Sequence, residues 1–293
     1  MNTNIESVPT GDELHQARKM ELIAKLQRGD FNLSFSSLSQ FAISPRAFIN
    51  YKLGERTTTD AMAMGSIVHC LVLEPDEFSS RYAVGPEANL ATKVGKEAFS
   101  AFLDQYLPVG WEWTNKADLI RQVMATCNIE VVTNSVYEEA KMRAKAIMDN
   151  QAARWVLNQI GETEIKVEYT INGFKFKGAI DGEGPSARID LKNYPSAVIR
   201  PVERDLIWGD YKMQAYCYGE ARGAKPYYII AVDGDGEVSV HGLSPKLIAD
   251  GGERLDFLTR HFQRAIDESR IFPEVWDMSQ DFWLYHSNGI NYL

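Results

Sequence analysis

The segment 167–193, VEYTINGFKFKGAIDGEGPSARIDLKN, carries a clear pattern of alternating apolar and polar residues. Alternating runs flank Asn172-Gly173, and an Asn-Gly pair between two such runs is a strong hairpin signal. A Gly-Glu-Gly-Pro turn follows Asp181 and leads into a third apolar run at 189–191. The pattern therefore predicts a β-hairpin followed by a third strand.

Elsewhere, apolar residues recur mainly at helical spacing. The pattern predicts helices at about 12–27, 36–44, 45–54, 60–73, 93–106, 115–128, 133–149, 151–160, 200–222 and 244–270, with the helix at 200–222 interrupted near Trp208. Two more strands are expected, a buried one at 227–232 and an edge strand at 237–243. This order predicts an N-terminal arm at 1–30, a main α/β domain at 31–270 with a helical insertion at about 90–160, and an aromatic tail at 271–293 that packs on the body or on a neighbouring subunit.

Composition places the chain among ordinary globular proteins. Its 293 residues are enough for one large domain, and no apolar run approaches the roughly 20 residues that span a bilayer. The N-terminus lacks the basic-then-apolar pattern of a signal peptide, so we expect a cytoplasmic protein without a membrane partner. Cys70, Cys127 and Cys217 lie too far apart for a metal or disulfide spacing, which argues against an iron–sulfur cluster. The net charge of −9 argues mildly against nucleic-acid binding, although a locally basic groove can coexist with an acidic exterior.

Two charges interrupt the third predicted strand and share one of its faces. Side chains alternate along a strand, so Asp190 and Lys192 project together while positions 189 and 191 face the other way. If the preceding strand lies alongside, Asp181 reaches the same patch. Carboxylates of this kind suit Mg²⁺, and a nearby lysine can orient or deprotonate an attacking water. This combination is typical of a metal-dependent phosphodiesterase.

A plainer interpretation of Asp190 and Lys192 is a surface ion pair on an edge strand. Acid-x-Lys triplets also occur at 139–141, 164–166 and 210–212, so the triplet by itself carries little weight. The upstream Asp181 and the short turn that follows it favour the metal site.

Other polar residues lie where they can serve either a site or the fold alone. His69 sits in the very apolar helix predicted at 60–73, where a buried histidine is either a hydrogen-bonded core residue or a ligand. Gln214 and Tyr218 are four residues apart and share a helix face, from which they can contact a nucleotide, orient the lysine or bond to another helix. Candidate phosphate contacts are Ser36, Ser37 and Arg46 at a hydroxyl-rich helix start, which plain capping also explains, and Arg200 and Lys212.

These pieces occur in one order: Gly65-x-x-x-His69 followed by LEPDEF, then Glu168, Asp181, Asp190-Leu-Lys192 and Gln214-x-x-x-Tyr218. In this order, and in the segments GSIVHCLVLEPDEF and DYKMQAYCYG, the chain resembles the RecE-type exonucleases (exonuclease VIII) of phages and prophages. Those enzymes belong to the RecB-like branch of the PD-(D/E)xK nuclease superfamily. The resemblance runs from about 34 to 219 and implies an α/β fold, with a small mixed central sheet flanked by helices and an N-terminal helical extension.

The resemblance also implies a metal centre. Asp181 and Asp190 would bind the divalent ions, with His69 and the main-chain carbonyl of Leu191 as further ligands. Lys192 would position the attacking water and stabilise charge on the attacked phosphate.

The remaining motif residues take their roles from the same resemblance. Gln214 and Tyr218 would form the final motif of the family. Glu168 would be the upstream acid, with Glu164 as its rival, because the strand period places both on one face. Asn193 stands where the family commonly has threonine, and its amide can still form a hydrogen bond there.

The activity implied by the resemblance is Mg²⁺-dependent degradation of the 5′ strand of linear double-stranded DNA, and Mn²⁺ would be able to substitute for Mg²⁺. The degradation would leave 3′ single strands for annealing. Family members form homo-oligomeric rings, and the implied partners are DNA ends and a RecT-like single-strand annealing protein in the cytoplasm of a bacterial host. Iron–sulfur members carry a cysteine where this chain has Ser44, so an enzyme without a cluster is expected. The alternatives are another RecB-like nuclease, endonucleolytic or of different polarity, and a DNA-end-binding protein that has lost catalysis.

Overall fold

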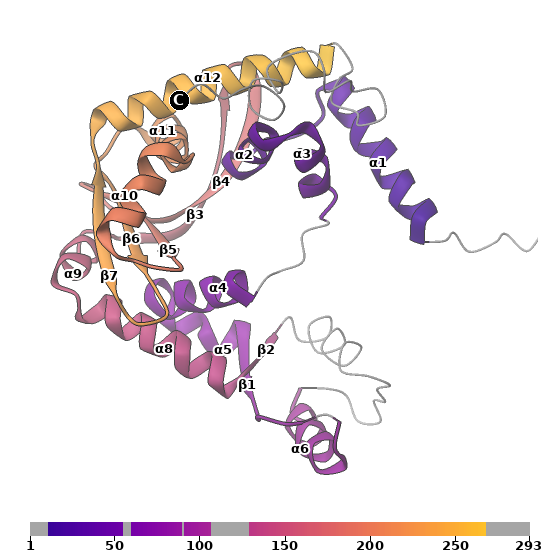
Figure 1. The fold of residues 1–293 in the computed structure, drawn as a ribbon, viewed down its shortest axis with the longest axis vertical. Helices are drawn as coiled ribbons and strands as arrows, with labels where there is room; N and C mark the ends of the chain where they lie inside the picture. Colours follow the sequence, from indigo (N-terminus) through magenta and orange to yellow (C-terminus); the bar gives the residue numbers. More distant parts are fainter. Residues whose placement is uncertain (1–10, 55–59, 90, 107–128, 268–293) are drawn as a thin grey trace, which may run out of the picture.

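The computed structural model describes residues 11–54, 60–89, 91–106 and 129–267, and its core is a five-stranded mixed sheet. The strand order is β3 (Glu162–Ile171), β4 (Phe174–Glu183), β5 (Arg188–Asn193), β6 (Tyr227–Val232) and β7 (Val238–Leu243). Neighbouring strands are antiparallel except for β5 and β6, which are parallel. The expected α/β class with a small mixed sheet is confirmed, and so is the edge position of β7 (Figure 1).

The hairpin of β3 and β4 forms around the predicted Asn-Gly turn. Asn172 has φ 53° and Gly173 has φ 80°, the left-handed conformations that a two-residue hairpin turn requires. The register runs without a shift from Ile171 opposite Phe174 to Glu162 opposite Glu183. Both strands are longer than predicted, and β4 continues through Asp181 to Glu183, so the turn into β5 lies at 184–187.

Helices cover both faces of the sheet. One face packs on α4 (Asp60–Leu73), α8 (Asn134–Asp149) and α9 (Gln151–Leu157), and the apolar side chains of Ile189 and Leu191 point to that side. The other face packs on α10 (Ile199–Trp208) and α11 (Tyr211–Arg222). The predicted break near Trp208 is the boundary between α10 and α11 (Figure 1).

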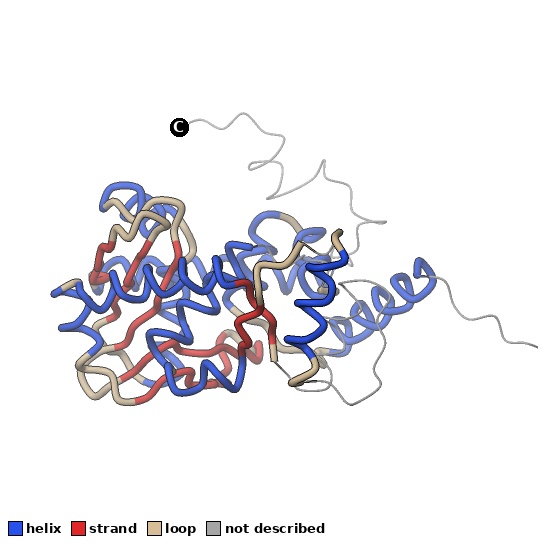
Figure 2. The backbone as a smooth tube through the Cα atoms, turned by 90° about the horizontal axis from the view of Figure 1, so that it is seen from below, coloured by secondary structure: helices blue, strands red, loops and turns tan. Residues whose placement is uncertain are grey.

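A second core forms where the free end of the hairpin meets the terminal helices. It joins α1 (Gly11–Arg28), α2 (Phe35–Ile43), α3 (Pro45–Lys52) and α12 (Pro245–Asp267). Phe262 of α12 lies at its centre, with ring centroids 4.9 Å from Phe41 and 5.0 Å from Phe48. Within the predicted arm, α1 is packed on the body at its C-terminal end, because Leu26 is fully buried in this core, while the start of α1 projects away (Figure 2).

Short elements near α4 and α8 were not predicted. They are η1 (Pro75–Glu77), α5 (Phe78–Arg81), and a two-stranded parallel sheet of β1 (Tyr82–Gly85) and β2 (Glu130–Thr133); the predicted helix at 93–106 is α6 (Lys93–Leu103). Strands of four residues carry too little alternation to be recognised from sequence. The helix predicted at 115–128, Cys127 and the aromatic tail lie outside the described residues. No helix among the described residues is long and apolar enough to cross a membrane.

Candidate active site

The site lies where β4 and β5 separate. The two strands are paired at Gly182 with Ile189 and at Glu183 with Arg188, and beyond these pairs the ladder ends. The Asp181 carboxylate fills the opening, because its Oδ2 accepts a hydrogen bond of 2.7 Å from the Leu191 N–H. The separation of the strands therefore leaves a carboxylate and the main chain of Leu191 side by side.

His69 reaches this opening from α4. Its Nε2 lies 2.9 Å from Asp181 Oδ2 and 3.2 Å from the Leu191 carbonyl oxygen, and its Nδ1 lies 3.0 Å from Glu164 Oε1. The predicted apolar helix thus delivers one polar side chain to the sheet. His69, Leu191 and Asp181 come together as the resemblance implies.

The structure places Glu164, and not the predicted upstream acid Glu168, beside His69 and Asp181. In the register of β3 and β4, Glu164 lies opposite Asp181. Its carboxylate contacts His69. Glu168 is exposed opposite Lys177, four residues and therefore about 13 Å further along β3. Glu164 has φ 50°, a left-handed conformation that is rare for a residue with a side chain and that alternation along a regular strand does not anticipate.

Asp190 and Lys192 project together from β5, as predicted. Asp190 Oδ2 lies 2.6 Å from Lys192 Nζ, and Asp190 Oδ1 accepts a 2.8 Å hydrogen bond from Gln214 Nε2 of α11. Asp190 is 1% exposed, so a surface ion pair on an edge strand is excluded for this carboxylate. β5 is a central strand, flanked by β4 and β6.

Burial and charge set the pKa values of these groups. Burial raises the pKa of Asp190 to about 6, although the Lys192 charge opposes the rise. Burial would also raise the pKa of Asp181, but the hydrogen bond from His69 and its charge outweigh burial and lower that pKa. Burial would lower the pKa of His69, but its hydrogen bonds to Asp181 and Glu164 raise it to about 10. Asp190 and Asp181 likewise outweigh burial and raise the pKa of Lys192.

Tyr218 is close to the site but does not reach the carboxylates. Its hydroxyl donates a 2.6 Å hydrogen bond to the Ala179 carbonyl of β4. Its ring lies against Gly178, where an added Cβ would stand 2.9 Å from the ring carbon Cε1. In this structure Tyr218 links α11 to β4 through this hydrogen bond.

Of the predicted phosphate contacts, Ser37 is contradicted. Its side chain is fully buried, and its hydroxyl donates to the Ser34 carbonyl at 3.0 Å within a capping box. Ser36 lines a pocket of about 300 Å³ together with Lys192 and Gln214. Arg46 is exposed on α3 and is absent from the described lining of that pocket.

The two later candidates lie on α10 and α11. Arg200 is exposed on α10, and Lys212 donates a 2.6 Å hydrogen bond to the Ile207 carbonyl at the junction of the two helices. Sequence reasoning missed Tyr211, whose ring centroid lies 5.4 Å from Lys192 Nζ. The position of Tyr211 directly after the predicted helix break was the one feature of the sequence that could have indicated it.

The donor atoms fit a divalent cation. Ligand atoms of His69, Glu164 and Asp181 all lie within 4.8 Å of one another, and the Leu191 carbonyl oxygen is 3.2 Å from the His69 ring. Carboxylate and carbonyl oxygens suit Mg²⁺ and Mn²⁺, and an imidazole ligand favours transition metals. Asp190 adds a carboxylate on the neighbouring residue of β5.

Comparisons with known proteins agree with this fold. The model of a family described as PDDEXK-like domain of unknown function (DUF3799) matches residues 34–244. The structure of a candidate exonuclease from Eubacterium rectale is 12% identical, with a TM-score of 0.52, over 97% of this chain and 100% of that one.

A second solved structure is more distant. An alkaline exonuclease from Laribacter hongkongensis is 17% identical over 67% of this chain and 96% of its own, with a TM-score of 0.31. No curated protein sequence matches the chain. The family match covers well over half of the chain and includes His69, Glu164, Asp181, Asp190 and Lys192. The chain therefore belongs to the DUF3799 family of PDDEXK-like domains.

Proposed function

We propose that this chain is a divalent-metal-dependent exodeoxyribonuclease, using Mg²⁺ or Mn²⁺, that degrades the 5′ strand of linear double-stranded DNA and leaves 3′ single strands. The observation that carries the proposal is the group of Asp181, Asp190 and Lys192 at the separation of β4 and β5, with Lys192 Nζ 2.6 Å from Asp190. The resemblance to RecE-type PD-(D/E)xK nucleases implies that these are the metal-binding acids and their lysine.

Five groups of the site would bind the metal ion. Asp181, Asp190, Glu164, His69 and the Leu191 carbonyl would hold the ion. When bound, the ion would activate water and stabilise charge on the attacked phosphate.

Gln214 and Lys192 contact Asp190 and have separate roles. Gln214 fixes the orientation of the Asp190 carboxylate through its 2.8 Å hydrogen bond. Lys192 carries a positive charge beside Asp190, where it can orient the attacking water and offset the negative charge that builds up on the phosphate.

Strand polarity, the preference for duplex ends, a homo-oligomeric ring, an annealing-protein partner and a bacterial cytoplasmic setting rest on the resemblance to RecE-type exonucleases. They form part of the proposal at that level. The exposed positions of Arg46 and Arg200 are compatible with contacts to DNA phosphates.

The test is digestion of linear duplex DNA labelled at either the 5′ or the 3′ end, in Mg²⁺ or EDTA. Wild type is compared with Lys192→Ala and with Lys246→Ala, a matched control whose side chain is 87% exposed on α12. We expect early release of the 5′ label in Mg²⁺, roughly 10²- to 10³-fold slower in Lys192→Ala and unchanged in the control.

Other outcomes separate the parts of the proposal. Early loss of the 3′ label, or cutting of closed circular duplex, would overturn the polarity or the end requirement. Binding to DNA ends without metal-dependent turnover would overturn the catalytic assignment altogether.

A further inference from the structure

One exposed face of α10 carries two arginines and a tryptophan at helical spacing. Arg200, Arg204 and Trp208 follow at intervals of four residues, so their side chains lie along one line of the helix. Trp208 is 82% exposed, the largest value among the exposed apolar residues of the described chain. Neither arginine forms an ion pair with another described residue. None of the three belongs to the group of acids, His69 and Lys192 described above.

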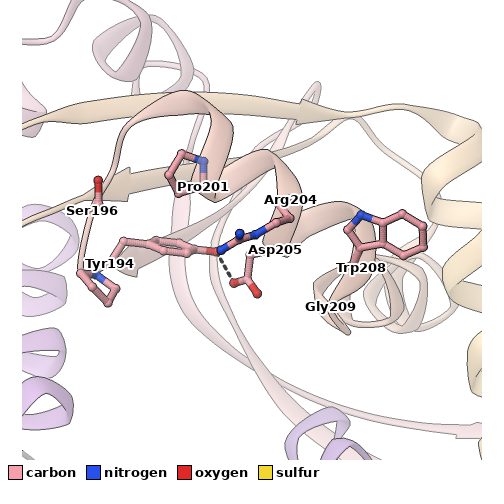
Figure 3. Close-up of a pocket in the computed structure, with 8 residues that line it drawn as sticks. Tyr194, Ser196, Pro201, Arg204, Asp205, Trp208 and Gly209 are labelled. Carbon is pink, nitrogen blue, oxygen red and sulfur yellow. Dashed lines mark hydrogen bonds between the residues drawn. The ribbon is translucent and has the colours of Figure 1, made fainter. Parts of the chain in front are cut away.

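A pocket of about 630 Å³ lies beside this face (Figure 3). Its lining includes Tyr194, Pro201, Arg204, Asp205 and Trp208. The Tyr194 hydroxyl donates a 3.0 Å hydrogen bond to Asp205 Oδ2, drawn dashed in Figure 3. This bond fixes the tyrosine ring on the pocket wall and gives the Asp205 carboxylate a hydrogen-bond partner. The pocket therefore offers two aromatic side chains and a guanidinium.

The pocket adjoins the reaction centre along the chain. Tyr194 follows Lys192 by two residues, which corresponds to about 7 Å along an extended strand. Tyr211 links the two places, because its ring lies 5.4 Å from Lys192 Nζ and its hydroxyl neighbours that of Tyr194. A polynucleotide whose phosphate is held at Lys192 can therefore reach the pocket within a few nucleotides.

We infer that this pocket binds unpaired DNA next to the scissile phosphate, with a base stacked on Trp208 and neighbouring phosphates held by Arg204 and Arg200. Base stacking on aromatic side chains combined with basic residues that follow the backbone is the usual mode of sequence-independent single-strand binding. The inference extends the proposed function and depends on it for the identity of the strand.

The position of the residues favours DNA over a protein partner. Arg200 and Arg204 form no ion pair with a described residue, although α10 also carries the exposed acids Glu203 and Asp205. Both guanidinium groups therefore remain available to phosphates. The α10 face also begins directly after the strand that carries Asp190 and Lys192. A second copy of the chain seated on Trp208 is the competing occupant, and the experiment separates the two.

The experiment measures binding of a labelled oligothymidine of about 12 nucleotides by fluorescence anisotropy, in EDTA so that hydrolysis cannot contribute. Wild type is compared with Trp208→Ala, Trp208→Phe and Trp155→Ala. Trp155 is the matched control, a tryptophan that is 58% exposed on α9. We expect Trp208→Ala to weaken binding roughly 5- to 100-fold, Trp208→Phe to recover most of the loss, and Trp155→Ala to match wild type.

The arginines give an independent readout. Arg204→Ala should reduce the slope of log affinity against log salt by about 1, whereas Arg154→Ala on α9 should leave the slope unchanged. Near-wild-type binding by Trp208→Ala, or no binding by the wild type, would overturn the inference. So would a Trp208→Ala variant that loses self-association, measured by sedimentation, while keeping its affinity for the oligonucleotide.

The same samples distinguish this inference from the proposed function. A wild type that binds the oligonucleotide through Trp208 but never hydrolyses DNA in Mg²⁺ would support single-strand binding and refute the nuclease assignment. A wild type that hydrolyses DNA while Trp208→Ala binds and cleaves equally well would leave the nuclease intact and refute the inference.

Discussion

The isosteric substitution Glu183→Gln should destabilise the protein and disturb the site at the same time. Glu183 is 5% exposed, and its carboxylate is surrounded by cations. Arg188 Nε donates to it at 2.7 Å, Lys225 Nζ at 2.9 Å and Arg222 Nε at 3.1 Å. Glutamine keeps the shape but leaves Arg188, which is 1% exposed, beside a neutral amide.

The pKa of Glu183 sets the size of the effect. Burial alone would raise this pKa, but the hydrogen bonds from Lys225, Arg188 and Arg222 lower it from 4.5 to about 2. At about 1.4 kcal/mol for each unit of pKa, the folded protein gains roughly 3 kcal/mol from the ionised carboxylate. Loss of one member of a buried ion pair costs a similar amount, about 3 to 5 kcal/mol.

The pH dependence has a fixed sign. Because the pKa of Glu183 is lower in the folded state, its contribution is fully present above about pH 4.5 and is lost as the pH falls towards about 2. The difference in unfolding free energy between wild type and Glu183→Gln should therefore be roughly 3 kcal/mol at pH 7 and about half of that at pH 3.

The assay is urea unfolding of both proteins at the two pH values, followed by circular dichroism. Glu162→Gln is the matched control, since Glu162 also contacts Arg222, at 3.6 Å, but is 66% exposed. We expect it to change the unfolding free energy by less than about 1 kcal/mol.

The same substitution should lower hydrolysis even at temperatures where the variant is folded. Glu183 and Arg188 form one of the two ladder pairs that join β4 to β5, and these pairs set the distance between Asp181 and Asp190. Equal stability losses in Glu183→Gln and Glu162→Gln, or a Glu183→Gln effect that does not shrink at low pH, would refute the reasoning.

Three further predictions follow from the local geometry. Glu164→Gln should raise the Mg²⁺ concentration needed for half-maximal hydrolysis about 10- to 100-fold while Glu168→Gln stays near wild type, and the reverse order would restore Glu168 as the upstream acid. Gly178→Ala should lower the unfolding free energy, measured by thermal unfolding, by about 1 to 3 kcal/mol, because the added Cβ would stand 2.9 Å from the Tyr218 ring. Gly219→Ala is the contrasting change: its Cβ would meet open space on α11, and the unfolding free energy should rise by about 0.5 to 1 kcal/mol. Tyr218→Phe should cost about 1 kcal/mol of stability through the lost hydrogen bond to β4 and change hydrolysis little, so a large loss of turnover at unchanged stability would make Tyr218 catalytic.

The sequence by itself determined the features that depend on near neighbours. The Asn172-Gly173 hairpin follows from the left-handed backbone that the turn needs. The shared face of Asp190 and Lys192 follows from the two-residue period of a strand, and the break before α11 follows from the polar and glycine residues there.

Only the tertiary structure decided which of these residues meet. Sequence alternation treats Glu164 and Glu168 alike, but the separation of β4 from β5 and the left-handed backbone at Glu164 bring just the first of them to His69. Ser37 has the composition of a phosphate contact, yet the packing of α2 buries it. The physical reason is that turn type and strand period are set by residues a few positions apart, whereas strand separation and helix approach are set by how the whole core packs.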